Sequence, residues 1–224
     1  MQSFKTRRDE SRLLNRVIDR ALVQPTMQHR EELLALAKQR DTQRLAERVR
    51  RRATRLSCHE RRQAQHILGN RDELIMALYA GRAPEGWANA WSDGSSHRRA
   101  AELHAGIGAV LLDKRGQCIS RISRYVAGKS AFEAEITALV AVLEDALRYH
   151  IERLRVNSDC KALVQLWYEQ REDPRLAPVR LLASRFKGLH INAIPRLHNQ
   201  TANALAKQAA SANPHIACRR THND

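Results

Sequence analysis

The chain reads WANAWSDGS over residues 87–95, a short apolar run that leads directly into Asp93. The run predicts a strand over 87–91 with this acid at its carboxyl end. Two further acids have comparable settings, since Glu135 lies on an apolar helical stretch and Asp159 follows another short apolar run. Carboxylates brought together from separate elements repel one another unless cations lie between them. The three acids therefore indicate a metal site.

The elements after residue 87 alternate in a way that predicts one mixed sheet. Three strands linked as hairpins come first, and the later strands are separated by helices, which implies parallel pairing through crossovers. We expect an α/β fold with a five-stranded sheet, helices on both faces, and both aspartates at strand ends, where such sheets bind ligands. The predicted strands are 87–91, 106–112, 118–126, 154–156 and 189–194, and the predicted helices are 131–150, 161–168, 179–186 and 201–210.

Residues 1–84 form a separate basic region that is predicted to be helical. Apolar residues recur at helical spacing over 27–80, and Asn70 with Glu73 matches a capping box after Gly69. Residues 1–20 predict only a frayed helix. The region is a nucleic-acid-binding module or, equally, a solvated hairpin or oligomerisation arm, since charge runs discriminate weakly. The arginines that motivate the first reading are Arg48, Arg50, Arg51, Arg52, Arg55, Arg61 and Arg62.

Charge and composition narrow the class of partner. Of the 224 residues, 39 are Lys or Arg and 24 are Asp or Glu, giving a formal net charge of +15. Residues 1–86 carry 19 basic residues against 11 acidic ones, and residues 87–224 carry 20 against 13, so both portions suit a polyanion such as nucleic acid. No apolar run has the length of a membrane span or a secretory signal. We expect a cytoplasmic protein with no membrane partner.

Four motifs in this order resemble the ribonuclease H family (type 1, within the wider ribonuclease H-like fold) over about residues 87–212, with 213–224 left as a tail. They are Ser92-Asp93-Gly94-Ser95 on the first strand, Ala134-Glu135 on the long helix, Ser158-Asp159 after the fourth strand, and IPRLHNQTANALA over 194–206. The resemblance implies an endonuclease that hydrolyses the RNA strand of RNA·DNA hybrids. It also implies Mg²⁺ as cofactor, with Mn²⁺ as the alternative, in a two-metal mechanism with the ions about 4 Å apart.

The resemblance also assigns roles to residues. Asp93, Glu135, Asp159 and Asn203 are the expected metal ligands and, with His198, the expected catalytic residues. Since the family usually has an aspartate where this chain has Asn203, one metal is expected to bind more weakly. His198 is expected to assist proton transfer, or else to be an exposed loop histidine. The expected substrate contacts are Gly94, Ser95, Lys161 and Arg196.

Two departures leave a second function open. Asn203 carries no charge, and Ala131 and Phe132 stand where family members often have paired asparagines that read the hybrid. These residues motivate a ribonuclease H fold that grips nucleic acid with little or no catalysis. Another nuclease of the same fold is a third reading, because a fold alone does not specify one reaction. Double-stranded nucleic acid is a further expected partner, held through residues 1–84.

Overall fold

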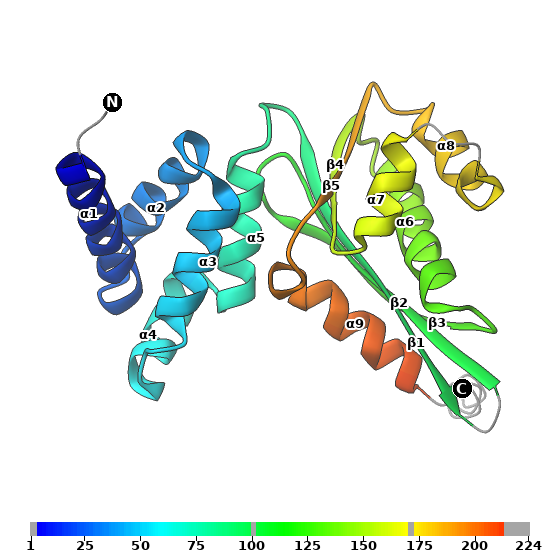
Figure 1. The fold of residues 1–224 in the computed structure, drawn as a ribbon, viewed down its shortest axis with the longest axis horizontal. Coiled ribbons are helices and arrows are strands. Elements are labelled where there is room, and N and C mark those ends of the chain that lie inside the picture. Colours follow the sequence, from blue (N-terminus) through cyan, green and yellow to red (C-terminus); the bar gives the residue numbers. More distant parts are fainter. Residues whose placement is uncertain (1–3, 100–101, 170–172, 213–224) are drawn as a thin grey trace, which may run out of the picture. The chain divides into compact units, whose positions relative to one another are not determined.

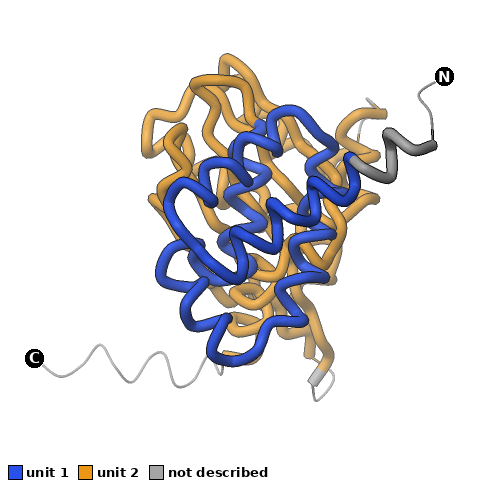
Figure 2. The backbone as a smooth tube through the Cα atoms, turned by 90° about the vertical axis from the view of Figure 1, so that its left-hand side faces the viewer, with its two compact units in different colours: residues 1–82 blue, residues 83–224 orange. Residues whose placement is uncertain are grey.

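The structure is a computed structural model that describes residues 4–99, 102–169 and 173–212. The described chain divides into two compact units, residues 1–82 and 83–224 (Figures 1 and 2). The predicted tail over 213–224 lies outside the described residues. No helix in the described ranges combines the length and apolarity needed to cross a bilayer.

The first unit is a bundle of five helices, as predicted for its central part. They are α1 (Phe4–Val23), α2 (Met27–Gln39), α3 (Thr42–Ala53), α4 (Cys58–Leu68) and α5 (Arg71–Gly81). The predicted capping box is confirmed: Asn70 accepts from the N–H of Glu73, whose carboxylate accepts from the N–H of Asn70.

The prediction of a frayed helix over residues 1–20 is wrong. Helix α1 continues to Val23, and Leu14, Ile18 and Leu22 are buried. A short apolar stripe suffices because α1 packs against α2, α3 and α4, and most helical stability in proteins comes from such packing.

A cavity of about 340 Å³ lies inside this helical unit. Its apolar lining includes Leu22, Leu68 and Leu74, while Arg61 and Arg71 stand at its polar rim. Helices α1, α3, α4 and α5 all contribute to the lining, as do residues between α3 and α4 and between α4 and α5.

The second unit is the expected mixed sheet, with strand order β3-β2-β1-β4-β5. Strands β1 and β2 and strands β2 and β3 pair antiparallel, while β1 and β4 and strands β4 and β5 pair parallel. The α/β fold class is therefore confirmed. The strands are β1 (Ala88–Arg99), β2 (Glu102–Leu112), β3 (Cys118–Ala127), β4 (Arg153–Ser158) and β5 (Gly188–Ala193).

Helices cover both faces of this sheet (Figure 1). Their bounds are α6 (Ala131–Arg148), α7 (Lys161–Tyr168), α8 (Ala177–Ala183) and α9 (Gln200–Ser211), with short 3₁₀ turns η1 (Pro174–Leu176) and η2 (Arg196–His198). Helices α6, α7 and α8 pack on a core that includes Ala90, Leu111 and Val156. Helix α9 lies on β2 across the opposite face, where a Cβ on Gly106 would come within 2.2 Å of the backbone of α9. Two strand glycines thus let this helix approach closely, the second being Gly108.

Candidate active site

Asp93 lies within β1 and not at its end, which corrects the predicted strand of 87–91. The strand continues to Arg99 because its polar half pairs with β2, in a register that sets Asp93 opposite Gly108. The aspartate is nevertheless beside the end of a strand: β4 pairs with β1 only as far as Ser92 and Ser158. Asp93 is 2% exposed, so its carboxyl group is almost wholly removed from water.

Glu135 reaches the same region because Gly94 has no side chain. Side chains alternate along a strand, so Ala90 and Gly94 face α6 while Asp93 faces the α9 side. A Cβ on Gly94 would lie 2.2 Å from the backbone nitrogen of Glu135. The first turn of α6 therefore rests on the β1 backbone next to Asp93. Gly94 therefore permits this close packing. The expected contact of Gly94 with substrate stays a prediction.

Asp159 is the third acid, and Asn199 connects it to β1. Its side chain is 6% exposed. The amide nitrogen of Asn199 donates to the Asp159 carboxylate and also to the backbone oxygen of Ser92, at 2.9 Å in the latter case. Asn199 is 1% exposed. This residue thus ties the loop before α9 to the middle of β1 and to the end of β4, and it orients one carboxylate.

The electrostatics show that the three acids share one site. The pKa of Asp93 is raised to about 7, mainly by burial. The negative charge of Asp159 and a hydrogen bond between the two side chains raise it further. Burial, followed by the charges of Asp93 and Asp159, raises the pKa of Glu135 to about 8. Burial is the larger cause of both shifts, and the neighbouring carboxylates add to it. In the metal-free protein, Asp93 and Glu135 therefore keep their protons to a higher pH than ordinary carboxyl groups do.

The oxygen atoms of this site fit a hard divalent cation. One carboxylate oxygen of Glu135, Oε2, is buried without a hydrogen-bond partner, and so is the amide oxygen of Asn199. Buried polar atoms in proteins are nearly always satisfied, so unpaired oxygens beside repelling carboxyls suit a cation that prefers oxygen ligands. Among the residues that the structure describes, no group of three or more His, Cys, Asp or Glu side chains is placed so that it could hold a metal ion. A cation would therefore draw further oxygens from an amide, water or substrate.

The remaining expected ligand, Asn203, lies in the first half of α9. It is 4% exposed, and its backbone N–H donates to the oxygen of Asn199 at 3.0 Å. The position is on the helix that covers the Asp93 face of the sheet, and the amide at Asn203 adds no charge to it. Its role as a ligand stays a prediction.

Cationic side chains stand at the exposed edge of the site. Arg196, whose side chain is 66% exposed, has its Nη1 atom 4.0 Å from a carboxylate oxygen of Asp159. The charges of Arg196 and Lys207 oppose the upward shift in the pKa of Asp93. Lys161 is exposed at the start of α7, and its backbone N–H donates to the oxygen of Asp159 at 3.0 Å. Ser95 is partly buried on β1. These groups suit the approach of a phosphate backbone.

The structure contradicts one of the two sequence interpretations of His198. The residue is 3% exposed within η2, so it is not an exposed loop histidine. Its expected assistance to proton transfer stays a prediction. Phe132 likewise turns inward: its ring packs against the core and lies under the Arg175 guanidinium, 4.7 Å from the ring centroid. It is therefore part of the packing of α6.

Sequence reasoning missed two members of the site, Asn199 and Lys207. Both lie one helical turn from Asn203, at i−4 and i+4, and residues at that spacing share a helix face. Their helical spacing from Asn203, the one expected ligand on α9, is the signal that could have found them.

Comparison with known proteins agrees with this architecture. A family model described as Reverse transcriptase-like matches residues 92–209, just over half of the chain. The chain belongs to the reverse transcriptase-like family. The expected resemblance to ribonuclease H is thereby confirmed, and the match begins at Ser92 and ends within α9, so it spans every element that carries the site. A search of curated proteins finds no match.

Solved structures with the same fold support the family assignment. Ribonuclease H1 from the halophilic archaeon Halobacterium salinarum NRC-1 is 26% identical with a TM-score of 0.50, covering 55% of this chain and 97% of its own. The N-terminal ribonuclease H domain of rv2228c from Mycobacterium tuberculosis is 23% identical with a TM-score of 0.51, covering 56% and 99%. A foamy viral protease-reverse transcriptase, in complex with an RNA/DNA hybrid, is 16% identical with a TM-score of 0.51 and covers 58% and 21%. The last two show the shared fold alone.

Proposed function

We propose that this protein is a metal-dependent endoribonuclease that hydrolyses the RNA strand of RNA·DNA hybrids. One observation carries the proposal: within a ribonuclease H-like fold, one buried and two partly buried acids from separate elements lie close together, and burial with mutual repulsion raises the pKa of Asp93 to about 7 and that of Glu135 to about 8. Proteins rarely bury such a cluster without a partner cation.

Asp93, Glu135 and Asp159 would hold the metal through carboxylate oxygens, and Asn203 through its amide oxygen. Mg²⁺, or Mn²⁺ as the alternative, supplies a bound water of lowered pKa and stabilises charge on the departing oxygen. The protein's own groups position the reactants. Asn199 keeps one carboxylate oriented, and exposed cations at the rim hold the phosphate backbone.

A cleavage assay tests the proposal. End-labelled RNA·DNA hybrid, double-stranded RNA and single-stranded RNA are each incubated with Mg²⁺ or Mn²⁺, using the wild type, Asp93→Asn and a matched surface variant. Glu144→Gln serves as the match because it removes one exposed acid from α6. We expect both metals to support cleavage of the hybrid by the wild type and by Glu144→Gln, and none by Asp93→Asn. If neither metal supports cleavage of the hybrid by the wild type, the proposed ribonuclease activity is refuted.

The alternative is a module that binds nucleic acid without cutting it, and two observations favour it. Asn203 contributes no charge, and Phe132 packs inward and is not presented to a substrate. Metal dependence separates the two functions. A binding module should hold the hybrid equally well in chelator and in Mg²⁺, whereas metal bound between the acids and the substrate phosphate should tighten binding in the enzyme.

A further inference from the structure

The basic helical unit divides its arginines into two groups, and the first group stabilises the bundle. On α3, the Arg48 guanidinium donates to Ser11 and Asn15 of α1 at 3.0 and 3.3 Å. Arg50 and Arg51 both donate to Glu47, with nitrogen–oxygen distances of 2.9 and 2.6 Å. Arg50, by hydrogen bonding, is the main cause that lowers the pKa of Glu47 to about 2.

Arg52 completes this group by pairing with Asp19 of α1. The guanidinium groups of these four arginines are thus engaged within the unit, three of them by carboxylates and Arg48 by neutral side chains. Four of the seven arginines that suggested a nucleic-acid-binding module are therefore explained by internal contacts.

The second group lies on and beside α4. We define the α4 face as Arg55, His59, Arg61, Arg62 and His66, all of which are exposed. Within the described residues, no ion pair engages any of them. The one acid on α4 is Glu60, and its carboxylate accepts from the backbone N–H of Ser57 in a capping box. Glu60 is thus the one carboxylate that this helix sets against the five side chains of the face.

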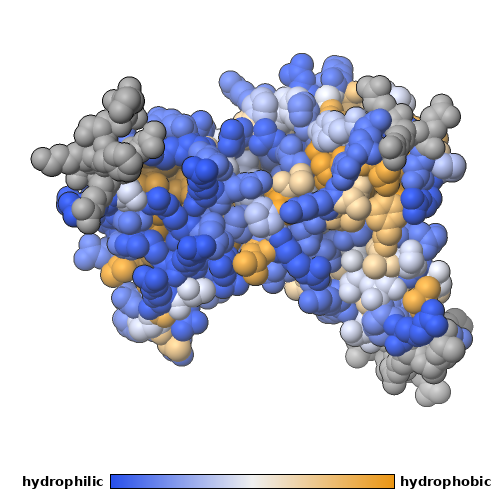
Figure 3. Space-filling model, in the orientation of Figure 1, coloured by the Kyte–Doolittle hydropathy of each residue, from blue (hydrophilic) through white to orange (hydrophobic). Residues whose placement is uncertain are grey.

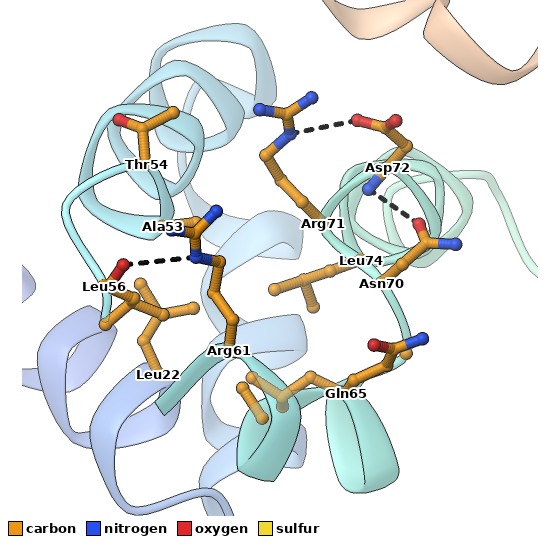
Figure 4. A pocket seen from close by; sticks show the side chains of 13 residues that line it. Leu22, Ala53, Thr54, Leu56, Arg61, Gln65, Asn70, Arg71, Asp72 and Leu74 are labelled. Atoms are coloured by element: carbon orange, nitrogen blue, oxygen red, sulfur yellow. Dashed lines mark hydrogen bonds and ion pairs between the residues drawn. The ribbon is translucent and has the colours of Figure 1, made fainter. Parts of the chain in front are cut away.

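Spacing along the helix gathers three of these five side chains on one side. His59, Arg62 and His66 follow at three and four residues, the spacing of neighbours on a helix surface. At 1.5 Å per residue they extend over roughly 10 Å, and Arg55 stands just before the helix begins. Arg61 is fixed beside them, since its Nε atom donates to the backbone oxygen of Leu56 at 3.1 Å (Figure 4). Its terminal nitrogens remain available.

Surface chemistry points the same way. The visible surface of the helical unit is largely hydrophilic, with apolar colour confined to small areas (Figure 3). Such a surface suits a polar or charged partner. Unpaired guanidinium groups in a row bind phosphates and release the counterions condensed on a duplex.

We propose that the α4 face is a second nucleic-acid contact, which binds the phosphate backbone of a double-stranded substrate independently of the acidic site. The choice of a hybrid as that duplex rests on the proposed function. The contact is independent of base sequence, because phosphates carry no sequence information.

The test compares two double variants that lose the same formal charge. Arg55→Gln with Arg62→Gln removes unpaired cations from the α4 face. Arg44→Gln with Arg51→Gln is the control, because these exposed arginines pair with Asp41 and Glu47. Both are made in the full chain carrying Asp93→Asn, and the affinity for fluorescently labelled hybrid is measured by anisotropy from 50 to 200 mM salt in chelator.

We expect the α4 variant to reduce the slope of log K against log salt by about 1.8, at roughly 0.9 per phosphate contact, and the control to leave it unchanged. At 50 mM salt the α4 variant should bind about tenfold more weakly than the parent, and the control within about threefold of it. Equal effects of the two variants, or no effect of either, would overturn the inference. Thermal unfolding by circular dichroism verifies that both variants fold.

The outcome is separable from that of the proposed nuclease. Selective loss of hybrid affinity in the α4 variant, alongside a wild type that cuts nothing, would leave the contact standing and refute the nuclease. Cleavage by the wild type, with unchanged hybrid affinity in the α4 variant, would support the nuclease and refute the contact at the α4 face.

Discussion

Replacing Asp93 with asparagine should stabilise the metal-free protein at alkaline pH while removing its proposed activity. The pKa of Asp93 is raised from its ordinary value of 3.8 to about 7. At a pH between these two values, the folded state keeps a proton that the unfolded state has released. The contribution to stability is therefore fully present below the unfolded pKa and is lost as pH rises through the folded one.

The magnitude follows from the width of the window. Between pH 5 and pH 9 the folded carboxyl group must lose its proton at about pH 7, some two units above the starting pH. At about 1.4 kcal/mol per unit, this destabilises the wild type by ~3 kcal/mol, and the neutral asparagine avoids that loss. Glu135 adds to the difference, since the charge of Asp93 helps to raise its pKa to about 8.

Urea unfolding followed by tryptophan fluorescence measures this difference. Trp87, Trp91 and Trp167 all belong to the unit over residues 83–224, so the signal reports the unit that contains the site. The free energy of unfolding is compared at pH 5 and pH 9 in chelator for the wild type, Asp93→Asn and the surface control Glu144→Gln.

We expect the gap between Asp93→Asn and the wild type to widen by ~3 kcal/mol in favour of the variant from pH 5 to pH 9. The control should follow the wild type. Adding Mg²⁺ at pH 9 should stabilise the wild type more than Asp93→Asn, because a ligand stabilises the state that binds it. Parallel pH profiles for all three proteins would refute the reasoning, because they would mean that the acid does not share a confined site with other anions.

Three further predictions concern the surroundings of the acids. Asn203→Asp adds a carboxylate, so half-maximal cleavage should need about tenfold less Mg²⁺; an unchanged titration would remove this residue from the ligand set. Asn199→Ala leaves Asp159 without its amide donor. We expect the free energy of unfolding to fall by ~1–3 kcal/mol and the cleavage rate to fall as well. Wild-type values for both would show that other contacts orient the carboxylate. Gly94→Ala would set a Cβ 2.2 Å from the backbone nitrogen of Glu135, so urea unfolding should show a loss of ~1–3 kcal/mol, and unaltered stability would contradict this tight packing.

Hydrophobic periodicity predicted most of the second unit. The helix predicted over 161–168 has those bounds in the structure, and the order of strands and helices is as expected. Periodicity failed for the second half of β1, where Ser95, Ser96 and His97 carry no apolar alternation. That half is a strand because β2 supplies an antiparallel partner along its whole length. Pairing between strands is a tertiary event, so local composition did not reveal it.

The helical unit shows a different limit. Its arginine content is evident from the chain, but whether an arginine is neutralised depends on acids brought close by packing. Arg52 pairs with Asp19, which is 33 residues away. By contrast, Arg55 and Arg62 meet no acid among the described residues. A count of charges treats all of these arginines alike, and only their neighbours distinguish those that hold the bundle from those that face solvent.

For the acidic site, the sequence by itself determined the identity of the three carboxylates, because acids beside buried strands and on an apolar helix are chemically conspicuous. Only the tertiary structure decided what surrounds them. Asn199 is a buried link between Asp159 and Ser92, and His198 is buried, although it could equally have been an exposed loop residue. The physical reason is that a side chain's chemical type is local, whereas burial and repulsion arise only when distant segments pack together.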